Sequence, residues 1–246
     1  MKIRIVKTPI KLARFKAVLF IALCSVFLVI TAFFSIKHIQ NVLAANYNSK
    51  DKEKIIIIDP GHGGVDGGAV GYNNIVEKNI NLAISLKLRS LFEASGYKVV
   101  MTREDDRSIH DEGSDTIREK KVTDIHNRSA ILEKYPSAIF ISIHQNKFEQ
   151  SQYSGTQVFY SKNNDDGKLL ASLIQNSAKE QLQPENDRVI KPAGKDLYIL
   201  YHAKLPAVMV ECGFLSNPRE ATLLNTDEYQ SKMAFSIYCG TLDYYT

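Results

Sequence analysis

Two histidines and two glutamates are the residues of this chain whose types and positions could do chemistry together. Each lies beside a short apolar run: His62 in a Gly-rich turn after Ile55–Ile58, Glu77 after Ile75-Val, His144 at the end of a run from Ile139, and Glu211 after Ala207-Val-Met-Val. Two imidazoles and one carboxylate are the ligand set of a catalytic zinc, whose fourth position stays open for water. A second carboxylate beside that water is what a metal-dependent hydrolase needs as a general base. If the four side chains converge, the chain is a zinc hydrolase.

Each of the three potential ligands also has an ordinary structural interpretation. His62 could be incidental to a Gly-rich turn, although a phosphate loop is disfavoured because no Lys followed by Ser or Thr comes after the glycines. His144 could be a satisfied, buried histidine. Glu77 could be an acid at a helix N-terminus, where it favours the helix dipole. Taken one at a time, these residues leave both interpretations open.

Glu211 is harder to explain as a structural residue. It ends an apolar run, and a carboxylate there is costly unless it is paired or solvated. Such a position favours a raised pKa and acid–base work. The neighbouring Cys212 is interpreted as a small buried residue, since nothing near it in sequence would activate a thiolate. No Gly-x-Ser-x-Gly motif occurs, so a serine hydrolase has no visible nucleophile.

Three further residues are candidates for substrate binding. Asn146 could hold a substrate carbonyl or cap the turn after His144. Arg103 ends a predicted strand and could pair with an acid or contact an anionic substrate. His202 precedes a predicted core strand and could line the site from a loop. Arg128 is expected to make a structural ion pair on its helix.

Alternating strands and helices must position these side chains. Strands are predicted at Ile55–Ile58, Tyr97–Thr102, Ala138–Ile143, Thr156–Tyr160, Leu197–Leu200 and Ala207–Val210, and helices at Leu82–Ala94, Thr116–Lys134, Asp166–Leu182, Pro218–Leu224 and Asp227–Tyr244. This order predicts an α/β fold with three layers, a mostly parallel central sheet flanked by helices on both faces. In such folds ligands bind at the carboxyl ends of strands. His62, His144 and Glu211 all follow a predicted strand.

The N-terminal residues, before the α/β domain, are predicted to direct the chain to a membrane. Residues 17–36 form a run of twenty without a charge, long enough to span a bilayer as a transmembrane helix. Basic residues in 1–16 place that segment in the cytoplasm and the rest of the chain outside. A cleavable signal peptide is the alternative, although the apolar run exceeds the usual ~7–15-residue core. We expect a linker at 37–54 and a catalytic domain at 55–246, anchored to the cytoplasmic membrane or secreted.

The charge of the chain is unevenly distributed. Residues 1–50 hold eight of the 31 Lys and Arg and none of the 27 Asp and Glu, so the rest of the chain has a formal net charge of −4. The basic balance therefore belongs to the N-terminal segment, and a nucleic-acid partner is not expected. Of the three cysteines, Cys24 lies in the apolar run, and Cys212 and Cys239 could pair without forming a disulfide framework.

At these residues the sequence resembles the zinc-dependent N-acetylmuramoyl-L-alanine amidases of the amidase-3 family. The matching blocks follow in order over residues 55–244: Ile58-Asp-Pro-Gly-His-Gly-Gly64, Glu77-Lys-Asn79, Met101-Thr-Arg103, Phe140-Ile-Ser-Ile-His-Gln-Asn146 and Val210-Glu-Cys-Gly-Phe-Leu-Ser-Asn217. The resemblance implies that His62, Glu77 and His144 bind zinc and that Glu211 is the catalytic glutamate. It also implies a peptidoglycan substrate, cut between the lactyl group of N-acetylmuramic acid and L-alanine.

Two departures from the family pattern refine this resemblance. Gln145 stands where relatives usually carry a small residue, and we expect it to alter the rim of the site. Only eleven residues, Gln145 to Gly155, separate His144 from the next strand, which leaves no room for the inhibitory helix of division amidases. The sequence is therefore most similar to the sporulation amidases of the CwlD type. That type implies a role in spore cortex maturation, through muramic-δ-lactam formation, and a location in the forespore intermembrane space.

Two other functions remain open at this point. A zinc peptidase that cuts within the stem peptide would use the same metal site. A membrane-tethered wall-binding subunit without catalysis would have no use for a base at Glu211. The sequence leaves open whether an accessory protein is needed.

Overall fold

The computed structural model describes residues 20, 31, 35–37 and 54–246. The chain divides into two compact units, Met1–Glu53 and Lys54–Thr246. None of the helices in the described residues is long and apolar enough to cross a membrane. Apart from residues 20, 31, 35 and 36, the predicted anchor at 17–36 lies outside the described residues, so it stays a prediction.

Strands and helices alternate through the unit Lys54–Thr246. In the described residues the elements are β1 (Ile55–Pro60), the 3-10 helix η1 (Tyr72–Asn74), α2 (Glu77–Ala94), β2 (Lys98–Met101), α3 (Ile117–Lys134), β3 (Ile139–Asn146), β4 (Gln157–Tyr160), α4 (Asp165–Gln181), β5 (Lys191–Pro192), α5 (Tyr198–His202), β6 (Ala207–Phe214), α6 (Pro218–Leu224) and α7 (Asp227–Tyr244). The predicted bounds of the two closing helices are confirmed. Strands β3 and β6 extend past their predicted ends, so His144 and Glu211 lie within strands.

The six strands of the described residues form one mixed sheet in the order β2-β1-β3-β6-β4-β5. Strands β2, β1, β3 and β6 are parallel, whereas β4 pairs antiparallel with β6 and parallel with β5. The α/β prediction is confirmed, but the sheet is less uniformly parallel than expected. The segment between β3 and β4 contains no helix that could carry the chain back across the sheet. Strand β4 therefore starts at the edge where β3 ends and runs in the opposite direction.

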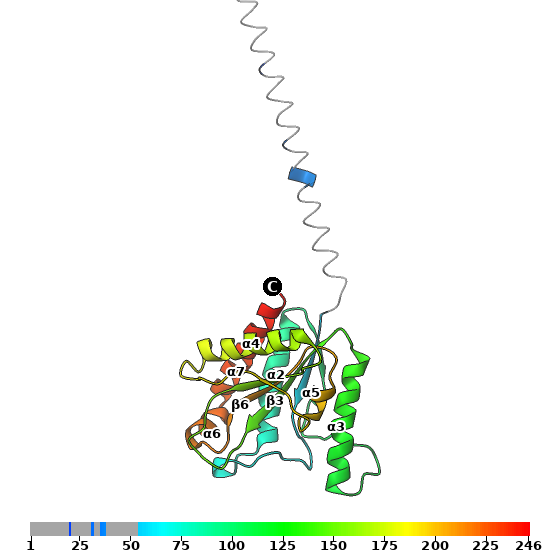
Figure 1. Ribbon diagram of the computed structural model, residues 1–246, viewed down its shortest axis with the longest axis vertical. Coiled ribbons are helices and arrows are strands. Elements are labelled where there is room, and N and C mark those ends of the chain that lie inside the picture. Colours follow the sequence, from blue (N-terminus) through cyan, green and yellow to red (C-terminus); the bar gives the residue numbers. More distant parts are fainter. Residues whose placement is uncertain (1–19, 21–30, 32–34, 38–53) are drawn as a thin grey trace, which may run out of the picture. The chain divides into compact units, whose positions relative to one another are not determined.

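Helices cover both faces of the sheet, as predicted (Figure 1). One apolar core joins α2, α4, α6 and α7 to the sheet, through side chains such as Ile84, Leu170 and Ile237. A second core joins α3 and α5 to the opposite face, through side chains such as Leu132, Leu200 and Phe140. The four isoleucines of β1 are divided between these two cores, which explains why that strand has no polar face.

Local sequence explains where the helices begin. The Thr116 side chain accepts a hydrogen bond from the Glu119 backbone N–H, and the Glu119 side chain accepts one from the Thr116 backbone N–H, which forms a capping box for α3. Helix α2 begins at Glu77, five residues before the predicted start at Leu82. The early start brings the Glu77 side chain to the first turn of a helix that packs on the sheet.

The prediction of a strand at Leu197–Leu200 is wrong. The structure has the short helix α5 there, and Leu200 packs in the core between α5 and the sheet. A short apolar run has the same pattern in a buried strand and in one turn of buried helix, so periodicity alone could not separate the two. Strand β5, with two residues, was not predicted.

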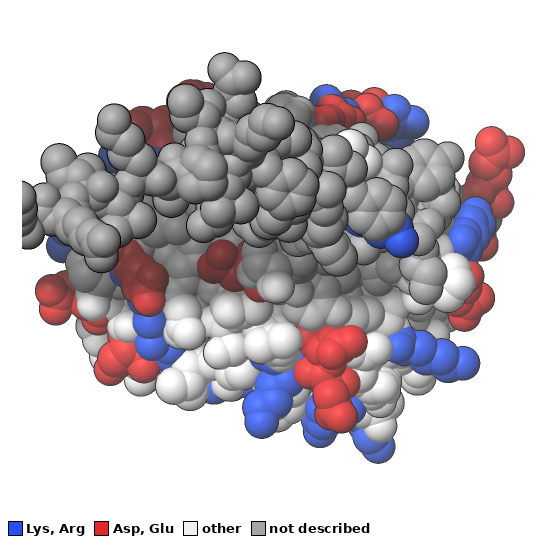
Figure 2. All heavy atoms as spheres, turned by 90° about the horizontal axis from the view of Figure 1, so that it is seen from above, with Lys and Arg blue, Asp and Glu red and all other residues white. Residues whose placement is uncertain are grey.

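Charges of both signs are visible on the described part of the chain. On the face seen in Figure 2, basic and acidic side chains lie next to one another in several places. Intermixed charges of this kind favour solubility and produce only weak long-range attraction for a ligand of one sign.

Arg128 is the centre of a buried polar network between α3 and β1. Its guanidinium group contacts Asp59 Oδ1 at 2.6 Å and Asp124 Oδ2 at 2.6 Å, and it donates to the carbonyl oxygens of Pro60 and His62. The predicted ion pair on its own helix is confirmed by the contact with Asp124, and the pair with Asp59 extends it to the sheet. Burial opposes ionisation of Asp59, but Arg128 and two hydroxyl donors outweigh burial and lower its pKa.

We predict that Arg128→Met lowers the free energy of unfolding by about 3–5 kcal/mol, because removing one partner leaves a buried carboxylate uncompensated. Urea denaturation measures the change. Arg118→Met, an exposed position on the same helix, is the control and should change stability by less than about 0.5 kcal/mol. The contribution of ionised Asp59 is present above its ordinary pKa of 3.8 and is lost as the pH falls through its lower folded value. Equal stability of the two variants at neutral pH would contradict this role.

Candidate active site

Three side chains with metal-ligand atoms converge at the carboxyl edge of β1 and β3. His62 comes from the turn after β1, Glu77 is the first residue of α2, and His144 lies near the end of β3. One ligand atom from each lies within 4.8 Å of the other two. His62 Nε2 is 3.3 Å from Glu77 Oε2, and His144 Nδ1 is 3.0 Å from Glu77 Oε1. The structure thus brings together the three residues that the sequence pattern had linked.

Glycines make this close approach possible. A Cβ atom at Gly61 would overlap the His144 imidazole, and one at Gly68 would lie 2.6 Å from Glu77 Oε2. His62 itself has a φ of 61°, a conformation in which few residues with a side chain are found. The glycines of this turn therefore provide the space into which His144 and Glu77 project.

Glu77 is held from behind by backbone donors. The Ala69 N–H donates to Oε2 at 2.8 Å, and the Gln145 N–H donates to Oε1 at 3.0 Å. Burial alone would raise the pKa of Glu77, but hydrogen bonds and charge interactions with His144 and His62 outweigh it and hold the pKa well below its usual range. The carboxylate is therefore ionised, the form that a metal ligand requires.

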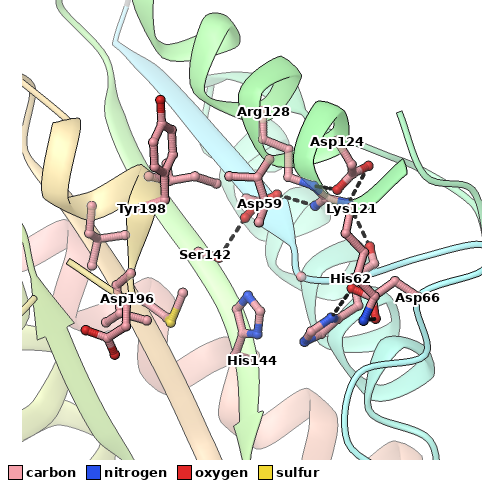
Figure 3. Close-up of a pocket in the computed structure, with 16 residues that line it drawn as sticks. Asp59, His62, Asp66, Lys121, Asp124, Arg128, Ser142, His144, Asp196 and Tyr198 are labelled. Carbon is pink, nitrogen blue, oxygen red and sulfur yellow. Dashed lines mark hydrogen bonds and ion pairs between the residues drawn. The ribbon is translucent and has the colours of Figure 1, made fainter. Parts of the chain in front are cut away.

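Asp66 orients His62 and was missed by the sequence analysis. Its Oδ2 lies 2.8 Å from His62 Nδ1, and its Oδ1 lies 2.8 Å from Lys121 Nζ on α3 (Figure 3). Burial lowers the pKa of His62, but Asp66 and Glu77 outweigh burial and raise it to about 9. Asp66 at Nδ1 directs Nε2 toward Glu77, and a metal would bind Nε2 with release of its proton. The sequence signal that could have identified Asp66 is its position four residues after the candidate ligand His62.

Glu211 lies next to this cluster on the neighbouring strand. It pairs with His144 in the register of β6 and β3, so the two side chains lie on the same face of the sheet. Its Oε2 is buried and has no hydrogen-bond partner in the described part of the chain. Burial raises the pKa of Glu211 to about 7, with His144 opposing and Glu77 reinforcing the change. A carboxyl group that titrates near neutral pH is suited to accept and return a proton.

The donor set fits a divalent metal of the zinc type. Two imidazoles and one ionised carboxylate are the ligands of many catalytic zinc sites. The carboxylates of Glu77 and Asp66 contact the imidazole nitrogens, so negative charge is available to neutralise a cation. The orphaned Oε2 of Glu211 is also explained if a polar group or water occupies the adjacent space.

A cavity of about 180 Å³ opens beside His62 and His144. Ile125 of α3 and Leu197 and Tyr198 at α5 form its apolar sides, with Lys121 and Asp196 among its charged lining residues (Figure 3). A small cavity with apolar walls and a few polar groups has the features of a binding site.

Arg103 is buried among backbone acceptors, which disfavours the predicted substrate contact. It is 3% exposed, and its guanidinium group donates to the carbonyl oxygens of Pro60, Gly61, Lys78 and Asp105. None of these acceptors is an acid side chain, so within the described residues the predicted ion pair is not formed. Arg103 instead holds the turn that precedes His62, because a buried guanidinium must place its N–H donors on acceptors.

The other two predicted substrate-binding residues differ in position. His202 lies at the end of α5 in a hollow with Glu133 and Lys204, separate from the cavity beside His62, so its predicted place in the site is not supported. Asn146 follows His144 by two residues on β3 and is partly exposed. Its side chain has no hydrogen bond within the described residues, and its role in substrate binding stays a prediction.

Two neighbouring residues face the core. Gln145 is 3% exposed and points toward α2, so the prediction that it alters the rim of the site is wrong. Side chains alternate between the faces of a strand, and His144 takes the open face. Cys212 is buried and unpaired, and burial raises the pKa of its thiol, which disfavours a nucleophilic thiolate. Cys239 is also unpaired, so the two do not form a disulfide.

Comparisons with known proteins place this geometry in context. Residues 56–242 match the family model described as N-acetylmuramoyl-L-alanine amidase. The germination-specific N-acetylmuramoyl-L-alanine amidase of Bacillus subtilis (strain 168) is 37% identical over 193 residues, which cover 78% of this chain and 80% of the relative.

Two solved structures are similar in fold as well as in sequence. The CwlD amidase of Clostridioides difficile, solved in complex with the GerS lipoprotein, has 45% identity and a TM-score of 0.75, covering 78% of this chain and 98% of that one. The amidase AmiC2 of Nostoc punctiforme has 28% identity and a TM-score of 0.67, covering 78% of this chain and 97% of that one.

We predict that Gly61→Ala lowers the affinity for a divalent metal by about tenfold or more, because the added methyl group displaces the His144 imidazole. Competition with a chromogenic chelator measures the affinity. Gly67→Ala lies in the same loop, where the added methyl group would meet only Val76 Cγ1 at 3.3 Å, and serves as the control. Equal metal affinity of the two variants would contradict the proposed crowding.

Proposed function

Since this chain belongs to the amidase-3 family of N-acetylmuramoyl-L-alanine amidases, and within it resembles the CwlD type, we propose that it is a zinc-dependent amidase of peptidoglycan. Its reaction is hydrolysis of the amide bond between the lactyl group of N-acetylmuramic acid and the L-alanine of the stem peptide. The observation that carries the proposal is the cluster of His62, Glu77 and His144 with the unpartnered carboxyl of Glu211 beside it.

His62, Glu77 and His144 are the residues that would hold zinc. Zinc, when bound, supplies a Lewis acid that polarises the amide carbonyl and makes water more acidic. Asp66 fixes the orientation of His62 through its Nδ1, and the backbone donors on Glu77 fix the orientation of that carboxylate. The protein thus contributes a site that is arranged before the substrate arrives.

Glu211 moves the proton in this mechanism. Its ionised carboxylate takes a proton from the attacking water, and its protonated form delivers that proton to the leaving nitrogen of L-alanine. A pKa raised by burial to about 7 suits both steps, because the two forms of the group are then close in free energy at neutral pH.

The biological role and location are further parts of the proposal. The similarity to the germination-specific amidase of Bacillus subtilis supports a role in spore cortex maturation by muramic-δ-lactam formation. The uncharged run at 17–36 supports anchoring of the catalytic domain to the outer side of the cytoplasmic membrane, for example in the forespore intermembrane space. An accessory protein is a candidate partner, because the CwlD amidase of Clostridioides difficile was solved with the GerS lipoprotein.

We predict that Glu211→Gln retains zinc and loses hydrolysis by about 10²–10⁴-fold, the usual contribution of a positioned general base. Release of soluble fragments from purified peptidoglycan measures activity, and chelator competition measures zinc. Glu228→Gln, an exposed position on α7, is the control and should keep full activity. Activity of Glu211→Gln equal to that of the control would rule out Glu211 as the base.

The bond that is cut distinguishes the amidase from a stem-peptide peptidase. Digestion of muropeptides with zinc is expected to release a peptide that starts with a free N-terminal alanine and a sugar that carries a bare lactyl carboxyl. Mass spectrometry identifies both products, and removal of zinc by a chelator should abolish them. Cleavage inside the stem peptide would favour the peptidase, whereas binding of muropeptides without any product would favour a wall-binding subunit.

A further inference from the structure

A pair of buried side-chain amides lies behind Glu77 and has no role in the mechanism so far. Gln145 of β3 donates from Nε2 to Asn81 Oδ1 at 3.1 Å, and Asn81 of α2 donates from Nδ2 to Glu77 Oε1 at 3.2 Å. Asn81 is fully buried and Gln145 is 3% exposed. The two amides therefore connect β3 to the carboxylate of Glu77, one of the three proposed metal ligands.

Glutamine at this position departs from the pattern of its strand. The preceding residues on the same face of β3 are Ile139, Ile141 and Ile143, all packed in the apolar core beneath α2. A buried amide is costly in such surroundings unless it is hydrogen-bonded. The bond from Gln145 Nε2 to Asn81 offsets part of this cost, whereas Gln145 Oε1 is buried with no hydrogen-bond partner among the described residues.

Acceptors at one end of the pair determine the orientation of both amides. Asn81 Nδ2 lies between the Gly61 carbonyl oxygen and Glu77 Oε1, at 3.2 Å from each. The reverse orientation would place Asn81 Oδ1 against these two oxygens, which repel it. With Nδ2 so placed, Asn81 Oδ1 faces Gln145, and only the NH₂ group of Gln145 can serve it.

We propose that Gln145 is a positioning residue that acts through Asn81 to hold Glu77 ready to bind the metal. The proposal rests on the proposed function, because it assigns a metal to Glu77. The Gln145 side chain locks the Asn81 amide, the amide holds Oε1 of Glu77 and the carbonyl of Gly61, and Gly61 immediately precedes His62. One pair of amides therefore supports the carboxylate ligand and the turn that carries an imidazole ligand.

The test is the zinc affinity of the purified full chain, measured by competition with a chromogenic chelator. Gln145→Met keeps the length of the side chain and removes the donor, and we expect it to weaken zinc binding by about tenfold, in the range for partners that orient a ligand. Asn81→Leu should weaken zinc binding at least as much. The double variant should bind zinc no more weakly than Asn81→Leu alone, because Gln145 acts through Asn81.

Gln175→Met is the matched control for the general cost of losing a buried amide. Gln175 is 2% exposed and bonds to the backbone of β4 and of the residue before it, and β4 lies three positions away from β1 in the strand order. Thermal unfolding without metal should show comparable destabilisation of Gln145→Met and Gln175→Met, whereas only Gln145→Met should lose zinc affinity.

Three results would overturn the proposal. Unchanged zinc affinity in Gln145→Met would leave Gln145 a purely structural residue, and additive losses in the double variant would exclude a route through Asn81. If Gln145→Met fails to fold, Gln145→Ala, whose cavity has room for water, takes its place under the same criteria.

A wild-type chain that neither binds zinc nor hydrolyses peptidoglycan would overturn the proposed function as well. A wild-type chain that does both, beside an unaffected variant, would overturn the positioning role alone.

Discussion

Two buried guanidinium groups hold the turn on which the rest of the site depends. Arg103 donates to the carbonyl oxygens of Pro60 and Gly61, and Arg128 donates to those of Pro60 and His62. A turn this tight directs its carbonyls inward, where water does not reach, and each buried carbonyl needs a donor. The arginines supply these donors and so keep His62 in its unusual backbone conformation.

Charge around that turn is arranged so that neighbouring carboxyl groups behave differently. Glu77 lies between two imidazoles and stays ionised, whereas Oε2 of Glu211 is buried with no hydrogen-bond partner among the described residues, and burial raises the pKa of Glu211 to about 7. The difference follows from the hydrogen bonds of each side chain, since Glu77 receives backbone donors and Oε2 of Glu211 receives none among the described residues. Pairs of acids whose surroundings push their pKa values apart are typical of acid–base catalysis.

The mixed sheet also explains how distant segments reach one edge. Parallel strands β1 and β3 end at the same edge, and β6 beside β3 brings Glu211 into register with His144. Strand β4 returns from that edge without a helix, so the chain beyond His144 stays close to the site. The short helix α5, predicted as a strand, forms part of the cavity wall through Tyr198. Because this segment was predicted as a strand, nothing in the sequence indicated that its side chains line the cavity.

The sequence by itself determined most of the elements and singled out the four central residues. Apolar runs, helix caps and glycines act locally, so β1, β3, β6 and the bounds of α6 and α7 could be predicted from them. The residue types of the proposed metal site could be singled out because zinc chemistry restricts its ligands to few residues.

Only the tertiary structure decided what each polar side chain faces. Arg103, His202 and Gln145 were assigned to the site or its rim from their neighbours in sequence, yet Arg103 supports a turn, His202 lies in a separate hollow, and Gln145 faces α2. The role of Asp66 likewise emerged from its distance to His62. Hydrogen bonds form between groups that packing brings together, often from segments far apart in the chain, and sequence spacing does not record that proximity.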